Sequence, residues 1–112
     1  MNPFIYVAGP YSGDAQGNTD RAIDVGNRLI NVGFNVYVPH LSHYMHARQQ
    51  RHYEDWMRID FDWITRCDAL YRMPGDSSGG DREVEFAKKM HIPVFYSVEA
   101  LFERFRSFIG TL

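Results

Sequence analysis

Cysteine is almost absent from this chain, because Cys67 is the only one among 112 residues. A single thiol excludes an internal disulfide, so we expect a protein of a reducing compartment, the cytoplasm. The opening stretch MNPFIYVAGP contains an apolar run far shorter than the roughly 20 residues that cross a bilayer, and too short for the core of a secretory signal. We therefore expect neither a membrane span nor an export signal.

Clustered positive charge is also missing. The 12 Lys and Arg residues are dispersed among 14 Asp and Glu, for a net charge of −2. Surfaces that bind nucleic acid concentrate basic residues, so we expect no nucleic-acid partner. The chain has the length of one domain, residues 1–112, with no repeat or low-complexity segment. Aromatic residues reach 15%, which suits a core, a stacking pocket or a subunit interface, and a core is the default interpretation.

Short apolar runs alternate with segments of helical periodicity. The apolar runs end at Gly, Pro or polar residues, as buried parallel strands do. Predicted strands are 4–8, 34–38, 68–73 and 92–97, and predicted helices are 20–32, 53–67, 81–91 and 98–109, with 40–55 irregular or weakly helical. We expect Thr19 or Asp20 to cap the first helix and Gly33 to end it. The alternation predicts a parallel sheet covered on both faces, with ligands at the carboxyl ends of the strands.

Two acids interrupt apolar helical stripes. Glu83 shares one helix face with Phe86, Ala87 and Met90, whereas Glu85 lies on the far side. Asp60 likewise falls within the apolar stripe of the preceding helix. A carboxylate on an inward face loses water or finds partners, and either changes its pKa.

These acids allow two interpretations. Each alone is as well explained by a helix cap or an ion pair at the edge of the core. Together, two inward carboxylates are what cleavage of a glycosidic bond requires: one acts as nucleophile or electrostatic stabiliser, and the other manages the proton of the leaving group.

Three further segments are candidates for binding. GDSSGGD precedes a helix N-terminus, where free N–H groups favour an anion such as phosphate, although an ordinary flexible loop fits as well. AGPYSG after the first strand can add backbone donors or be a simple turn. His40, His43 and His46 have a spacing compatible with metal ligands, but no supporting motif of the H-E-x-x-H kind is present, and histidines that line a substrate pocket fit better.

Three stretches together resemble the nucleoside 2-deoxyribosyltransferase-like superfamily: IYVAGPYSG, DFDWITRCDALYRMPG and SSGGDREVEFAKKMHIPVF. Its small phage and bacterial members are the most similar. The resemblance spans about residues 4 to 97 and implies a flavodoxin-like or Rossmann-like three-layer α/β sandwich with a parallel sheet of four to five strands.

The resemblance implies a role for individual residues. Glu83, four residues before Ala87, corresponds to the nucleophile that attacks the sugar C1′, Asp60 to the acid that assists the leaving base, and Tyr6 to a tyrosine near the nucleophile. Residues that correspond to substrate-binding positions are Gly9, Ser12 and Gly13 in the first loop, His40 and His43 after the second strand, and Ser77 and Gly79 at the 5′ phosphate. Ser12 stands where some monophosphate hydrolases carry an arginine.

We therefore expect an enzyme that cleaves or exchanges the N-glycosidic bond of a (deoxy)nucleoside or its 5′-monophosphate, without a metal or other cofactor. Such an enzyme binds a small-molecule nucleoside or nucleotide and works as a homo-oligomer, a dimer. A non-catalytic nucleotide-binding or sensing module is the alternative, and a metal-dependent hydrolase built on the three histidines is a remoter one.

Overall fold

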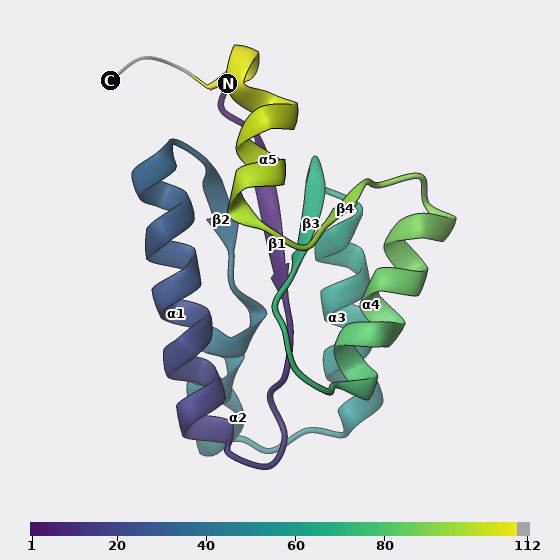
Figure 1. Ribbon diagram of the computed structural model, residues 1–112. Coiled ribbons are helices and arrows are strands. Elements are labelled where there is room, and N and C mark those ends of the chain that lie inside the picture. The colour runs from purple at the N-terminus through teal and green to yellow at the C-terminus, as the bar shows by residue number, and fades with distance from the viewer. Residues whose placement is uncertain (110–112) are drawn as a thin grey trace.

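A parallel sheet in the order β2-β1-β3-β4 runs through the middle of the computed structural model, which describes residues 1–109 (Figure 1). The four strands are β1 Phe4–Ala8, β2 Asn35–Tyr37, β3 Ala69–Arg72 and β4 Val94–Phe95. β1 pairs with both β2 and β3, so it lies at the centre, and β3 pairs in parallel with β4. The predicted α/β class with a parallel sheet of four to five strands is confirmed, and within residues 1–109 the sheet has four strands.

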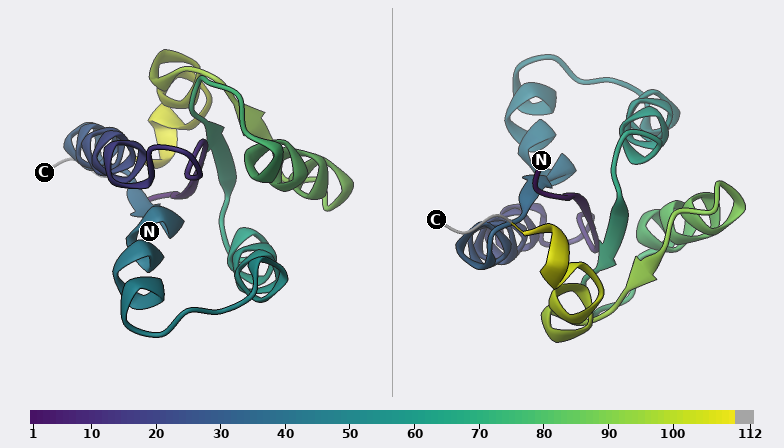
Figure 2. Two further views of the ribbon diagram at one scale, coloured as in Figure 1. Left: turned by 90° about the horizontal axis from the view of Figure 1, so that it is seen from below. Right: turned by 90° about the horizontal axis from the view of Figure 1, so that it is seen from above.

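Helices cover both faces of this sheet, which gives three layers (Figure 2). They are α1 Ala15–Val32, α2 Ser42–Arg48, α3 Tyr53–Ile64, α4 Ser78–Lys89 and α5 Val98–Phe105, with single 3-10 turns at Pro39–Leu41 and Arg106–Phe108. α1 and α5 pack on one face, and α3 and α4 pack on the other. None of these helices is long and apolar enough to cross a membrane within residues 1–109.

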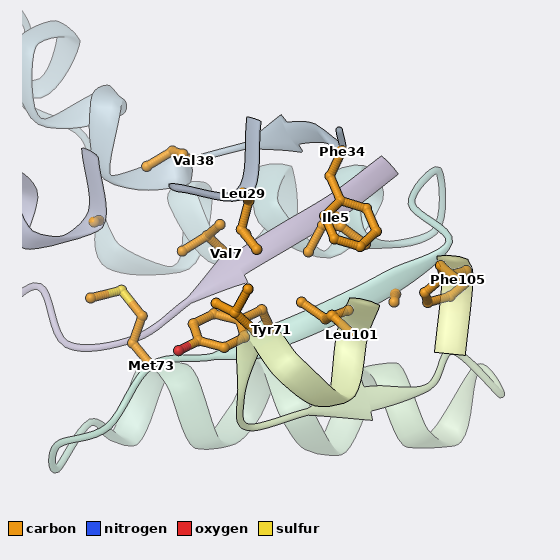
Figure 3. Packing of buried hydrophobic residues seen from close by; sticks show 12 residues of the cluster. Ile5, Val7, Leu29, Phe34, Val38, Tyr71, Met73, Leu101 and Phe105 are labelled. Atoms are coloured by element: carbon orange, nitrogen blue, oxygen red, sulfur yellow. The ribbon is translucent and has the colours of Figure 1, made fainter. Parts of the chain in front are cut away.

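Alternate residues of the central strand divide the core between the two faces. Ile5 and Val7 point into the larger cluster, with Leu29 of α1 and Leu101 of α5 (Figure 3). Tyr6 and Ala8 point to the α3–α4 side. Because strand side chains alternate, a polar hydroxyl at Tyr6 is placed on the side that faces the two predicted acids.

Several predicted boundaries and one predicted face are wrong. The last strand spans only Val94–Phe95, and the last helix ends at Phe105. α1 begins at Ala15 because the Asp14 carboxylate accepts from the Gly17 N–H at 3.0 Å and caps the helix there, so Thr19 lies buried inside the helix. α4 begins at Ser78, earlier than predicted, because Ser77 is its N-cap. Met90 is 47% exposed, since α4 ends before it and its side chain leaves the inward face.

Candidate functional site

Glu83, Tyr6 and Asp60 meet on the α3–α4 face of the sheet. Glu83 comes from α4 and is 5% exposed. The hydroxyl of Tyr6, fully buried on β1, donates to Glu83 Oε2 at 2.5 Å. Asp60 of α3 contacts both groups closely enough to affect their protonation. The sequence alone does not decide whether Tyr6 only fills the core or presents its hydroxyl to the site. The structure places this hydroxyl against the Glu83 carboxylate.

Burial governs protonation of the two acids. Loss of water is the main reason why the pKa of Glu83 is raised to about 8; the hydrogen bond from Tyr6 opposes this rise, and the negative charge of Asp60 adds to it. Burial also raises the pKa of Asp60 to about 6. The pKa of the Tyr6 hydroxyl is raised well above its ordinary value, chiefly by burial, so it remains a donor. The acid pair therefore holds one proton between pH of about 6 and about 8.

A cavity of about 570 Å³ opens above this pair, at the carboxyl ends of β1 and β3. Its volume lies in the range of small-molecule sites, roughly 300 to 1,000 Å³. The predicted site residues that line it are Asp60, Glu83, Gly9, Ser12, His40, Ser77 and Gly79. The first loop, the segment after β2, α3 and the start of α4 thus all contribute to one site.

Two predicted binding residues lie elsewhere. Gly13 is exposed at a positive φ of 93°, in a turn before α1, and does not belong to the lining of the cavity. The Nδ1 of His43 hydrogen-bonds the hydroxyl of Tyr11 at 2.7 Å, which turns this ring away to support the first loop. In their place Tyr11 lines the cavity.

The start of α4 forms one end of the cavity. Ser77 Oγ accepts from the Gly80 N–H at 2.9 Å, which leaves its own O–H free to donate outward. A Cβ on Gly79 would lie 3.1 Å from the hydroxyl of Tyr53, so glycine keeps this helix N-terminus open. Peptide N–H groups of the first turn and these hydroxyls can together hold an anion.

Arg72 supports this end from beneath and was not predicted from sequence. Its side chain is buried at the end of β3, donates to the carbonyls of Met73 and of Gly75, the latter at 3.0 Å, and pairs with Asp81 at 3.1 Å. These bonds fix the loop that leads to Ser77. An arginine within the apolar run ALYRM is the signal that could have revealed it.

The three histidines of the spaced series have different partners. His40 is buried, its Nε2–H donates to the Pro10 carbonyl at 3.0 Å, and burial lowers its pKa. His46 Nδ1 accepts from the indole N–H of Trp56 at 2.9 Å. Within residues 1–109 no group of three His, Cys, Asp or Glu side chains is placed to hold a metal ion.

His46 also lines the cavity, in agreement with the interpretation of the histidine series as pocket residues, and so do Trp56 and Arg51, which sequence reasoning did not assign to the substrate pocket. They come from α2, α3 and the connection between these helices. This is the segment whose periodicity was ambiguous, and the third histidine of the series was its only usable signal.

A solved structure has the same fold. It is a 2-deoxyribosyltransferase from the psychrotolerant bacterium Bacillus psychrosaccharolyticus, similar over 81% of this chain and 69% of that one, with a TM-score of 0.55 and 18% sequence identity. The protein thus has a nucleoside 2-deoxyribosyltransferase-like fold, as the resemblance predicted. By sequence, the chain belongs to the family described as Domain of unknown function (DUF4406), which matches residues 3–96. No curated protein matches it.

Proposed function

We propose that the protein is an enzyme that cleaves or transfers the N-glycosidic bond of a nucleoside or a nucleoside 5′-monophosphate. The observation that carries this proposal is the buried pair of Asp60 and Glu83, joined to the Tyr6 hydroxyl at the floor of a cavity of nucleoside size. The similar structure is named as a 2-deoxyribosyltransferase, which supports the same class of chemistry.

The single proton of the acid pair suits this reaction. The higher pKa of Glu83 means that the shared proton rests there, and its transfer to Asp60 leaves Glu83 ionised, with the Tyr6 hydroxyl hydrogen-bonded to the negative charge. A Glu83 oxygen forms a bond to C1′ while the C1′–N bond breaks, and its electron pair goes to the base. Asp60 gives its proton to the base, which leaves neutral. The product of this step is a glycosyl ester of Glu83.

The second step reverses the roles. Ionised Asp60 takes a proton from water or from the nitrogen of an incoming base, and the resulting nucleophile attacks C1′. The bond between C1′ and the Glu83 oxygen breaks, so Glu83 is again ionised and Asp60 protonated. Water gives hydrolysis, and a base gives transfer. Neither step needs a metal or an organic cofactor.

The start of α4 and the first loop would hold the 5′ end of the sugar. Ser77 and Gly79 lie beside the free N–H groups of the helix, and Gly9 and Ser12 face them from the loop after β1. Charge-assisted hydrogen bonds of this kind are the stronger ones, so a 5′-phosphate would be bound better than a hydroxyl.

A panel of nucleosides and their 5′-monophosphates tests the function, with release of free base as the readout. We expect turnover by the wild-type protein and its loss in Glu83→Gln. Glu85→Gln is the matched control, because Glu85 is exposed on the same helix. Binding without base release in the wild type would replace the enzyme with a nucleotide-binding module, and equal activity of the two variants would overturn the role of Glu83.

We also propose that the protein works as a dimer. The many apolar residues of the closing helix predicted over 98–109 suggest an interface between two copies. Of these residues, Leu101 and Phe105 of α5 are buried in the core of the same chain. Phe102 and Phe108 remain exposed and keep an apolar surface available.

A further inference from the structure

The wall of the cavity formed by α2 and the start of α3 carries a group of polar side chains to which the proposed mechanism assigns no role. Arg51 and His46 line the cavity there, together with the indole of Trp56. The guanidinium carbon of Arg51 lies 5.6 Å from the centre of the Trp56 ring, an arrangement that holds the arginine against the wall. Its one described acceptor is the carbonyl of Gln49, at 3.3 Å.

Hydrogen bonding fixes His46 as a donor on this wall. Its Nδ1 lies 2.9 Å from the indole N–H of Trp56 and 3.2 Å from the backbone N–H of Arg51. Both groups are donors, so Nδ1 is the acceptor and the ring proton is on Nε2. Arg51 offers only N–H donors as well. The side-chain nitrogens left for a ligand at this wall therefore all donate.

The two ends of the cavity differ in what they contact. Tyr53 and Met57 of α3 lie against Gly79, at the end proposed for the 5′ group. Trp56 lies on the neighbouring face of the same helix and bonds to α2 instead. With C1′ above Asp60 and Glu83, a sugar whose 5′ group lies at Gly79 directs its base toward the wall of Arg51 and His46. This step rests on the proposed function.

We propose that Arg51, assisted by His46, selects the base and favours 6-oxopurines over 6-aminopurines. A 6-oxopurine presents two neighbouring acceptors, O6 and N7, which an arginine binds with two parallel N–H bonds. Adenine presents an N–H₂ donor in place of O6, and this donor would face the side-chain donors of Arg51 and His46. An unpaired polar group costs more than a lost contact, so the wall excludes adenine as well as favouring its oxo counterpart.

Exchange of Arg51 for glutamine tests this assignment, because glutamine binds the N6 and N7 positions of adenine as arginine binds O6 and N7. We expect wild-type kcat/KM for 2′-deoxyinosine and 2′-deoxyguanosine to exceed that for 2′-deoxyadenosine at least tenfold. Arg51→Ala should remove most of this ratio, and Arg51→Gln should reverse it. Arg48→Ala is the matched control, because Arg48 is exposed at the end of α2 and does not line the cavity.

Binding to Glu83→Gln, measured by calorimetry with the same three nucleosides, separates the inference from the reaction. If no nucleoside is turned over but this variant still prefers the oxopurines, the enzymatic proposal fails and the assignment of Arg51 holds. If turnover is observed without a preference for oxopurines, or if the preference survives in both Arg51→Ala and Arg51→Gln, the assignment fails and the reaction stands. Absence of binding to all three nucleosides overturns both.

Discussion

Glu83→Gln should stabilise the folded protein while it removes activity. The glutamate is 5% exposed, and its pKa is raised to about 8 from an ordinary value of 4.5. A raised pKa means that the folded state binds a proton more tightly than the unfolded state does. Stability from this proton is complete below about pH 4.5 and is lost as the pH rises through about 8. Glutamine is neutral at every pH and avoids that loss.

The structure gives the size of the effect. A difference between 4.5 and about 8 corresponds to about 5 kcal/mol in the free energy of unfolding once the pH exceeds both values. A neutral amide accepts a weaker hydrogen bond from Tyr6 than an ionised carboxylate does, which offsets part of this gain, so we expect about 2 to 4 kcal/mol at pH 9. The gain should shrink toward zero at pH 4, where Glu83 is protonated in both states.

Urea unfolding at pH 4, 7 and 9 measures this difference, with tryptophan fluorescence as the signal. Glu85→Gln serves as the control, since an exposed carboxylate has no such penalty to remove. A Glu83→Gln variant that is less stable than the wild type at pH 9, or whose gain does not grow with pH, would show that the carboxylate is already ionised and well solvated in the folded state. The proposed sharing of one proton would then be wrong.

Four other outcomes are expected. The kcat/KM of the wild type should rise through about pH 6 and fall through about pH 8, because only the singly protonated acid pair is active; a flat profile over this range contradicts it. Ser77→Ala should lower kcat/KM for 5′-monophosphates about tenfold and leave kcat/KM for nucleosides unchanged. The same substitution should lower the free energy of unfolding by about 1 kcal/mol, because α4 loses its N-cap. An equal loss with nucleosides argues against a phosphate contact. Chelators should leave turnover unchanged, and loss of activity that zinc restores would overturn this. Light scattering at micromolar concentration should give the mass of a dimer, whereas a monomer would refute the oligomer.

The sheet and the two acids could be predicted because the signals for them are local. Alternation of apolar runs with helical periodicity is written in neighbouring residues, and a helix face assigns Glu83 inward and Glu85 outward from spacing alone. Asp60 follows from the same periodicity on α3. Tyr6 needed the resemblance, since alternation along a strand tells which face a side chain takes and not which face holds the site.

The part of the cavity that His46, Arg51 and Trp56 line could not be predicted, because contacts between α2, α3 and their connection create it. Trp56 binds His46 across two helices, and Arg51 is placed by that pair in a connection without regular periodicity. Arg72 is hidden for a related reason. Local sequence patterns treat an arginine in a strand as a polar, exposed residue. Arg72 can be buried because the carbonyls of the following loop accept its hydrogen bonds, and these contacts are seen only in the structure.

The hydrogen bond from Tyr6 to Glu83 joins residues 77 positions apart in the chain. Parallel strands must be connected by crossovers. β3 must therefore pair with β1, and α4 must pack on the sheet, before Tyr6 can contact Glu83. Closure of a loop of this length costs conformational entropy, and this cost arises before contacts within the site can offset it, so the step is slow. A nascent chain emerging from the ribosome therefore has no partial site that could act early. Catalytic competence should appear only once β1, β3, α3 and α4 have assembled, and recovery of activity after dilution from urea would measure that step.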